Sequence, residues 1–222
     1  MKYDMVVFDL DGTVIDSVED IMNALNETLR DFVIPYQYDY EHAKALLGGG
    51  ALELVRKVFT TIGKDADSPF FDIFCEQYYI RYKENQGKYT LLYPKMDEVI
   101  TYLIDNGVKV AIFSNKPERV ILNSIDSLLD INRLEFVLGH QDGYPAKPDT
   151  TAFFERLKTL NIDPNNTRIL YVGDSDVDMI FAKNIRADGC GCSYGYRSRK
   201  ELIENGASYI IDTPIEIIEL VK

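Results

Sequence analysis

The sequence contains few cysteines, no long apolar run and no excess of basic residues. Three cysteines among 222 residues are an odd number and do not make a disulfide framework, so a reducing cytoplasm is the simplest setting. No apolar run approaches the ~20 residues of a membrane span. The first residues lack the basic start and the apolar core that a signal peptide would have. We therefore expect a cytoplasmic protein.

Acidic residues outnumber basic ones, with 36 Asp and Glu against 24 Lys and Arg, which gives a net charge of −12. Such a surface repels phosphate backbones and anionic lipids, so we expect no nucleic-acid partner and no membrane partner. Apolar residues make up 46% of the chain, which is enough for a buried core. An anionic substrate would have to be neutralised locally.

Short apolar runs rich in β-branched residues recur along the chain, with helical patterns between the later ones. These runs predict strands at 5–8, 108–113, 136–139, 168–173, 189–193 and 208–212. Strands that are apolar on both faces indicate a parallel sheet covered on both sides. The expected fold class is therefore α/β, with a Rossmann-like doubly wound parallel sheet as its core. Cys190 and Cys192 alternate in the fifth run, where we expect small strand residues rather than metal ligands.

The alternation of strands and helices is interrupted after the first strand. Residues 16–90 show no convincing strand, and their apolar spacing predicts four helices, at 17–32, 39–47, 51–62 and 69–86. Four helices are too many for one crossover, so we expect an inserted α-helical cap domain of residues 16–90. The core domain would consist of residues 1–15 and 91–222. Ser17 is the expected N-cap of the first helix, with Asp20 completing a capping box.

Polar side chains follow the predicted strands at the edge where an open parallel sheet binds its ligands. This edge collects Asp9, Asp11, Gly12, Thr13, Ser114, Asn115, Lys147, Asp174 and Asp178. Crowded carboxylates repel one another unless a cation lies among them, and oxygen ligands without His or Cys favour Mg²⁺. Hydroxyl, amide, ammonium and backbone N–H groups can donate to a phosphate. The set predicts phosphoryl transfer.

The order of these motifs resembles that of the haloacid dehalogenase superfamily of phosphotransferases. The matching motifs are D-x-D-G-T at 9–13, S-N at 114–115, K-P at 147–148 and G-D-S-x-x-D at 173–178. The helical insert resembles the type-1 cap of that family. The segments VIDS (14–17), LLGGGALELV (46–55) and ENGASYIIDTPIEII (204–218) resemble its phosphoglycolate-phosphatase-like subgroup. The third motif departs from the common K-P-x-P because Thr150 stands at the last position, where it can cap the next helix.

The resemblance implies catalytic roles for two residues and metal binding for four. Asp9 would be the nucleophile, form an aspartyl-phosphate and bind Mg²⁺. Asp11 would protonate the leaving oxygen and then activate water, and its backbone carbonyl would bind the metal. Asp174 would be a metal ligand, and Asp178 would support the metal indirectly or through a water molecule.

The resemblance also implies which residues hold the substrate. Thr13, Ser114 and Asn115 would bind the phosphoryl group, next to backbone N–H groups around Gly12, whose missing side chain permits a close approach. Lys147 would neutralise the phosphate and hold Asp9 in place. In the cap, Gly49 of the Gly48–Gly50 turn is the expected substrate contact. Lys44 and Arg56 are the nearest basic candidates for a substrate carboxylate.

The function expected from these features is that of a Mg²⁺-dependent phosphomonoester hydrolase acting on a small phosphorylated metabolite, first of all 2-phosphoglycolate. We expect a monomer or a homodimer. A phosphomutase of the β-phosphoglucomutase type, a pyrophosphatase or nucleotidase, and a non-catalytic metabolite-binding protein remain as alternatives. Within the resemblance, Asp11 argues for phosphate esters and Thr13 for hydrolysis.

Overall fold

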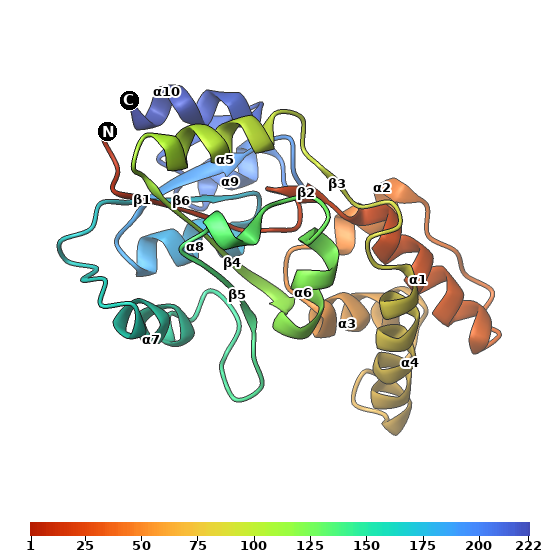
Figure 1. Cartoon of the computed structure of the whole chain (residues 1–222). Helices are drawn as coiled ribbons and strands as arrows, with labels where there is room; N and C mark the ends of the chain where they lie inside the picture. Colours follow the sequence, from red (N-terminus) through yellow and green to blue (C-terminus); the bar gives the residue numbers. More distant parts are fainter.

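A six-stranded parallel sheet forms the centre of the molecule, in the order β5-β4-β1-β6-β7-β8 (Figure 1). The computed structural model describes residues 1–222. The strands are β1 (Met5–Phe8), β4 (Lys109–Pro117), β5 (Phe136–His140), β6 (Ile169–Gly173), β7 (Asp188–Cys192) and β8 (Tyr209–Ile211). Every pairing in the sheet is parallel. The predicted doubly wound α/β class is confirmed, and the first strand of the chain lies inside the sheet, between β4 and β6.

Helices cover both faces of this sheet, which is why its strands are apolar throughout. The core helices are α5 (Met96–Asp105), α6 (Glu118–Ile125), α7 (Thr151–Thr159), α8 (Asp176–Asn184), α9 (Arg199–Glu204) and α10 (Ile217–Val221), with short 3₁₀ turns η1 (Ile131–Arg133) and η2 (Pro214–Glu216). Along β1, Val6 and Phe8 pack in a cluster with α5 and α10. Met5 and Val7 point to the opposite face and pack with α7 and α8. The alternation of side chains along one strand thus supplies both apolar layers.

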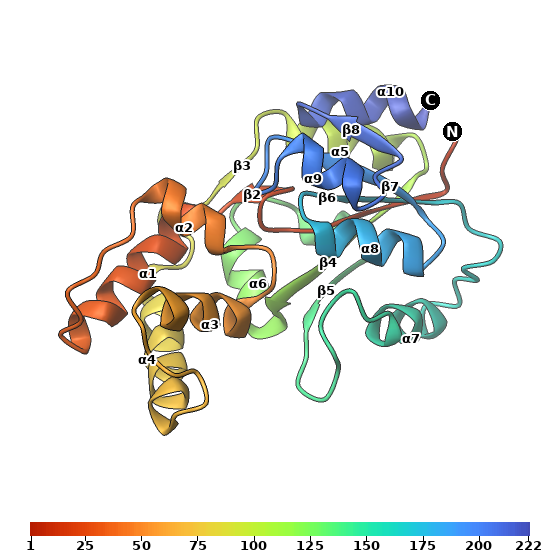
Figure 2. The ribbon, with the colours of Figure 1, turned by 180° about the vertical axis from the view of Figure 1, so that it is seen from behind.

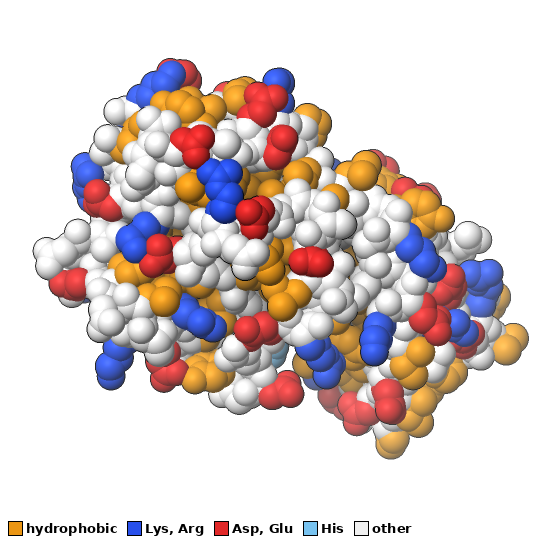
Figure 3. Space-filling view, viewed as in Figure 1, with side chains coloured by type: hydrophobic (Ala, Val, Ile, Leu, Met, Phe, Trp, Pro, Cys, Tyr) orange, Lys and Arg blue, Asp and Glu red, His pale blue; other side chains and the backbone are white.

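The fifth predicted strand contains the two cysteines of the C-x-C pattern. Cys190 and Cys192 are buried, free of disulfides and part of the same apolar cluster on one face of β7. They serve as small strand residues, as expected. None of the helices combines the length and the apolar composition that crossing a bilayer requires. Acidic and basic side chains are interspersed over the face of the molecule seen in Figure 3.

Four helices between β1 and α5 form a separate lobe beside the sheet (Figures 1 and 2). They are α1 (Val18–Asp31), α2 (Tyr40–Leu46), α3 (Ala51–Thr61) and α4 (Pro69–Asn85). Their inward faces share a cluster of 18 buried residues that includes Leu25, Phe59 and Phe74. Because Val120 is the only member of this cluster from outside residues 16–90, the lobe has an apolar core of its own.

The chain enters and leaves this lobe through a small sheet that the sequence does not predict. Strands β2 (Ile15–Asp16) and β3 (Leu91–Leu92) pair antiparallel, so the two crossing segments lie side by side. Each strand has two residues, which is too short to show an alternating pattern. The pair holds the two connections at one point of the core.

The start of α1 differs from the predicted capping box. Ser17 is the N-cap residue, but its side chain makes no capping bond. The Ser17 hydroxyl instead donates to Asp11 Oδ1 at 2.5 Å. The Val18 N–H, at the start of the helix, donates to Asp16 Oδ1 at 3.1 Å. The capping-box prediction is therefore wrong, because a tertiary contact takes the Ser17 hydroxyl. Asp16 is the junction residue that caps the helix.

Asp20 has a different task from the predicted one. It is fully buried and accepts the Gly87 N–H at 2.7 Å, the Tyr89 N–H at 2.9 Å and the Thr90 hydroxyl at 2.5 Å. These three donors lie on the segment that leads from α4 back to the core. One carboxylate on the entering helix therefore fastens the exit of the lobe.

We expect Asp20→Asn to lower the free energy of unfolding by about 2–4 kcal/mol, because an amide cannot accept all three buried donors. Urea unfolding followed by circular dichroism measures this loss. The matched control is Asp65→Asn, whose carboxylate accepts the Asp67 N–H at the surface and which should cost less than about 0.5 kcal/mol. Equal losses in the two variants would contradict the proposed fastening role.

Candidate active site

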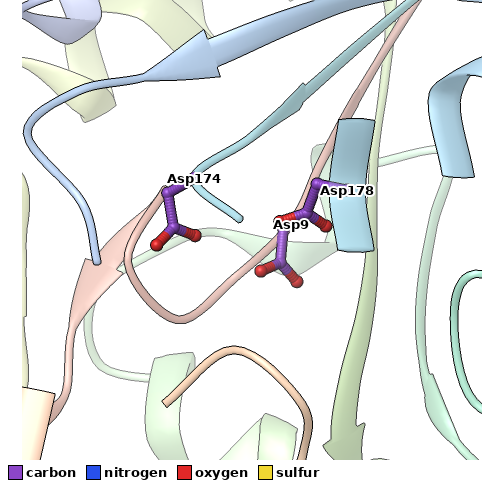
Figure 4. Close-up of side chains that lie close together, drawn as sticks. All are labelled: Asp9, Asp174 and Asp178. Atoms are coloured by element: carbon purple, nitrogen blue, oxygen red, sulfur yellow. The ribbon is translucent and has the colours of Figure 1, made fainter. Parts of the chain in front are cut away.

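Three carboxylates meet at the carboxyl end of the central strands, as Figure 4 shows. Asp9 directly follows β1, Asp174 directly follows β6, and Asp178 lies in the first turn of α8. One carboxylate oxygen of each residue lies within 4.8 Å of those of the other two. Asp174 and Asp178 are each 1% exposed and Asp9 is 9% exposed. The structure thus brings together three residues that are far apart in the sequence.

A single buried lysine neutralises part of this charge. Lys147 Nζ lies 2.8 Å from Asp9 Oδ1 and 2.7 Å from Asp178 Oδ1. It also donates to the Tyr171 hydroxyl at 2.9 Å and to the Phe113 carbonyl at 3.2 Å. Burial lowers the pKa of Lys147, but attraction to Asp178 and Asp9 outweighs burial and raises the pKa well above its ordinary value. Lys147 is therefore a fixed cation.

The remaining negative charge makes the ionised state of the cluster costly. Burial raises the pKa of Asp9 to about 6 despite the attraction of Lys147, and repulsion from Asp178 and Asp11 adds to the rise. Burial and repulsion from Asp178 and Asp9 raise the pKa of Asp174 well above its ordinary value. Oxygen ligands without nitrogen or sulfur suit a hard divalent cation, which would relieve this repulsion. The donor set fits Mg²⁺.

Asp174 is oriented by two neighbours and by the shape of the 9–13 loop. Its Oδ2 accepts the Tyr196 N–H at 2.7 Å, and its Oδ1 accepts the Thr13 hydroxyl at 3.1 Å. Gly12 has φ +88°, and a Cβ there would lie 2.3 Å from Asp174 Oδ2. Only glycine combines this left-handed backbone with such a close approach.

Two predicted phosphate-binding residues thus have other bonds in the structure. The Gly12 N–H donates to the Ile15 carbonyl at 2.8 Å, and the buried Thr13 hydroxyl donates to Asp174. Gly12 makes room for the metal-site carboxylate, and Thr13 orients it. The Asp11 N–H, in contrast, donates no hydrogen bond.

Asp178 is held by the start of its own helix. Its Oδ2 accepts the N–H of Ser175 at 3.1 Å and the hydroxyl at 2.6 Å, and Ser175 Oγ in turn accepts the Asp178 N–H. This reciprocal capping box fixes one oxygen while the other contacts Lys147. Asp176 begins the same helix and stays partly exposed, 3.7 Å from Arg197. Asp176 thus lies outside the buried acidic cluster.

Asp11 pairs with a lysine that sequence reasoning did not single out. Lys116 Nζ lies 2.9 Å from Asp11 Oδ1 and 3.2 Å from Oδ2, and the Lys116 side chain is 5% exposed. β4 runs to Pro117, beyond its predicted end at residue 113, so this lysine lies on the strand. Ser114 and Lys116 are two residues apart, and this spacing could have indicated that they share a face.

Asn115 and Ser114, the two remaining core residues of the predicted site, differ in whether their side chains are free to bind a substrate. Asn115 Oδ1 accepts the Lys147 N–H at 2.7 Å and its Nδ2 donates to the Lys147 carbonyl at 3.2 Å. Its side chain therefore fastens the lysine loop to β4, and Asn115 also lines the cavity. Ser114 lines the cavity, and its oxygen accepts the Lys116 N–H at 3.2 Å, which leaves its own O–H free to donate.

A cavity of about 80 Å³ lies between this edge of the sheet and the helical lobe. Gly48, Gly50, Tyr78 and Tyr82 line it from the lobe, and Asp9, Asp11, Ser114, Lys116 and Lys147 line it from the core. The predicted contact Gly49 does not line it, because the residues on either side of Gly49 face inward instead.

The two basic residues of the lobe that were predicted to bind a substrate carboxylate do not reach the cavity. Neither Lys44 nor Arg56 lines the cavity, and the Arg56 guanidinium lies 4.9 Å from the ring centre of Phe71. A helical pattern alone does not show which face of a helix is turned toward a distant loop, so these positions could not be separated in advance.

Comparison with known proteins gives one family and several relatives. The model of the haloacid dehalogenase-like hydrolase family matches residues 6–191. The chain is similar to phosphoglycolate phosphatase of Pseudomonas syringae pv. syringae, with 31% identity over 215 residues, covering 94% of this chain and 76% of the relative. It is similar to phosphoglycolate phosphatase of Aquifex aeolicus, with 29% identity over 216 residues, covering 97% and 95%.

Solved structures share the fold at lower identity. A predicted phosphoglycolate phosphatase from Haemophilus somnus superposes with a TM-score of 0.87 at 24% identity, covering 100% of this chain and 99% of the other. A haloacid dehalogenase-like family hydrolase from Streptococcus pneumoniae gives a TM-score of 0.85 at 20% identity, with the same coverage. These likenesses support the architecture of the core and the helical lobe.

The raised pKa of Asp9 has a consequence for stability that can be measured. Because the pKa of about 6 lies above the unfolded value of about 3.9, the metal-free folded protein binds more protons than the unfolded chain between these pH values. The contribution of Asp9 to the free energy of unfolding is therefore fully present below about pH 4, and it is lost as the pH rises through about 6. A divalent cation competes with these protons and offsets the loss.

We expect Mg²⁺ to raise the Tm, and to raise it more at about pH 7.5 than at about pH 5, where protons occupy the site. Differential scanning fluorimetry measures both shifts. Asp174→Asn should abolish most of the shift, and Asp176→Asn, a nearby carboxylate outside the cluster, should keep it. The same shift in both variants would show that Mg²⁺ binds elsewhere.

Proposed function

The chain belongs to the haloacid dehalogenase-like hydrolase family, and from this premise we propose that it is a Mg²⁺-dependent phosphomonoester hydrolase acting on a small phosphorylated metabolite. Its relatives are phosphatases by name, so phosphatase is the class of enzyme to which it belongs. Because those names specify phosphoglycolate, we propose 2-phosphoglycolate as the first substrate. The observation that carries the proposal is Asp9, held by Lys147 at the cavity with Asp11 beside it.

The proposed reaction begins with Asp9. Lys147 engages Asp9 Oδ1, and Oδ2 has no hydrogen-bond partner, so Oδ2 is the oxygen available for attack. Attack on phosphorus would form an aspartyl-phosphate and release the alcohol, which divides the hydrolysis into two easier displacements. Ser114 and the Asp11 N–H are the donors available to the phosphoryl oxygens.

Asp11 is proposed to move the proton in both halves of the reaction. It would protonate the leaving oxygen, and then, as a carboxylate, take a proton from the water that cleaves the aspartyl-phosphate. Ser17 and Lys116 hold the Asp11 side chain at the cavity, so its position is set from both the entry of the helical lobe and β4. A fixed carboxylate beside the nucleophile supports this assignment.

Mg²⁺ would be held by Asp9, Asp174 and the Asp11 carbonyl, with Asp178 supporting it. When bound, it would neutralise charge on the phosphoryl oxygens and offset the repulsion among the carboxylates. Thr13, Tyr196 and Ser175 orient the acidic side chains, as the hydrogen bonds of the site indicate. These residues act by position and do not touch the substrate in this proposal.

We propose that residues 16–90 are a cap domain over a core formed by residues 1–15 and 91–222. Leu47 and Gly48 close the cavity from the cap side, and Arg197 of the core donates to the Leu47 carbonyl at 2.6 Å. The β2–β3 pair is the natural pivot, because both connections pass through it. Closure of the cap would exclude bulk water during phosphoryl transfer.

We expect Asp9→Asn to reduce phosphate release to background and Asp11→Asn to reduce kcat by about 10²–10⁴-fold. Release of phosphate from a broad panel of esters in the presence of Mg²⁺ measures both. The control is Asp16→Asn, the third carboxylate of the same stretch, which caps α1 and should stay within a few-fold of wild type.

Two outcomes count against the proposal. Turnover by Asp9→Asn at the wild-type rate would remove the nucleophile from the mechanism. An absence of phosphate release from every ester of the panel, in folded wild-type protein with Mg²⁺, would remove the hydrolase itself.

A further inference from the structure

Few charged side chains reach the cavity, and they differ in what they can still bind. The charged lining consists of Asp9, Asp11, Lys116 and Lys147. Lys147 has four oxygen partners within 3.2 Å, more than its three protons can satisfy. It has no donor left for a substrate group beyond the phosphate region. Lys116 is the other lining cation, and no arginine or histidine lines the cavity.

Lys116 keeps capacity for a further anion. Its only side-chain hydrogen bonds go to the two oxygens of one carboxylate, that of Asp11. Its ammonium lies 4.9 Å from the ring centre of Tyr82, which comes from α4 of the cap. A lysine ammonium has three donors, so an incoming anionic group can bind it beside Asp11.

Tyr82 gives an independent indication of a missing ligand. It lines the cavity, is only 5% exposed, and its hydroxyl has no hydrogen-bond partner. Buried polar groups in folded proteins nearly always have a partner, so a hydroxyl without one, on a residue that lines the cavity, indicates a place for one. Tyr78 stacks on Tyr82 with ring centres 6.0 Å apart and lines the same wall.

We propose that Lys116 and Tyr82 form the binding site for a second anionic group of the substrate, a carboxylate. The inference rests on the proposed phosphatase function and specifies its substrate class. Lys116 comes from the core and Tyr82 from the cap, so the carboxylate would be bound by both domains at once. Lys116 replaces the predicted candidates Lys44 and Arg56, which lie outside the cavity.

The geometry also limits the length of the substrate. Lys116 bonds directly to Asp11, which is two residues from the proposed nucleophile Asp9. The carboxylate and the phosphate must therefore be separated by few atoms, as the cavity of about 80 Å³ also requires. A short phosphorylated acid meets both conditions, and a bulky nucleotide meets neither.

The test compares two esters of equal length that differ in one group. The acid is 2-phosphoglycolate, and 2-hydroxyethyl phosphate carries a neutral hydroxymethyl group in place of the carboxylate. We expect wild type to prefer the acid by about 10²-fold in kcat/KM, since a group that bonds a charged partner discriminates strongly. Lys116→Met should reduce this preference to less than about 3-fold, mainly through a higher KM for the acid. Tyr82→Phe should reduce it about 5- to 10-fold.

Matched controls separate recognition from general damage. Tyr38→Phe removes another buried cap hydroxyl that has no partner, at a residue that does not line the cavity. Lys57→Met removes a cap lysine that donates to the Leu46 carbonyl outside the cavity. Both should keep the wild-type preference. Lys116→Arg, which retains a cation, should keep most of it.

Equal use of the two esters by wild type would overturn this inference and leave the phosphatase proposal standing. A parallel loss of both activities in Lys116→Met, with an unchanged ratio, would also overturn it and would make Lys116 a positioning residue for Asp11. Release of phosphate from no ester at all would overturn the phosphatase proposal and this inference with it. If circular dichroism shows that Lys116→Met does not fold, the Tyr82→Phe and Tyr38→Phe pair decides.

Discussion

The mutual repulsion of three buried carboxylates, offset by one buried ammonium, governs the arrangement around it. Asp9, Asp174 and Asp178 each place a carboxylate oxygen within 4.8 Å of the other two, and Lys147 is the lysine that pairs with this group. Burial makes each ionised carboxylate costly unless it is paired and hydrogen-bonded. Around the triad, hydroxyl and N–H groups accordingly point to the acids rather than to open space. A site of this kind is stable in the absence of substrate only with protons or a metal ion in it.

The scaffold answers this constraint by placing the acidic residues on the sheet and the lobe of residues 16–90 opposite them. The acidic residues follow parallel strands β1 and β6 and begin helix α8, so their backbone is fixed by the sheet. The cap meets this edge through glycines and tyrosines and is tied to it by few polar contacts. One carboxylate, that of Asp20, fastens the cap's exit segment away from the cavity. The residues that hold the buried charge thus lie on other elements than the residue that fastens the lobe.

The sequence predicted what depends on short-range pattern. Apolar runs, the polar residues after them and the four helices of the insert could all be located, because strands, strand ends and amphipathic helices leave local signals. It could not predict the partners of Thr13 and Asn115, because their side chains form hydrogen bonds with residues that are distant in the sequence. For the same reason the capping box at Ser17 was wrong. Lys116 and Tyr82 were missed because they are chemically ordinary until the fold places a core strand opposite a cap helix.

The central claim is that Asp9 carries the phosphoryl group during turnover, and rapid acid quench with mass spectrometry of the digested protein tests it most directly. The account predicts a peptide containing residues 5–16 that gains the mass of one phosphoryl group, with fragmentation assigning it to Asp9. The modification should appear in wild-type protein within one turnover and be absent from Asp9→Asn, which lacks the nucleophile. A phosphoryl group on another residue, or phosphate release without any labelled peptide in a quench fast enough to trap one, would contradict the account.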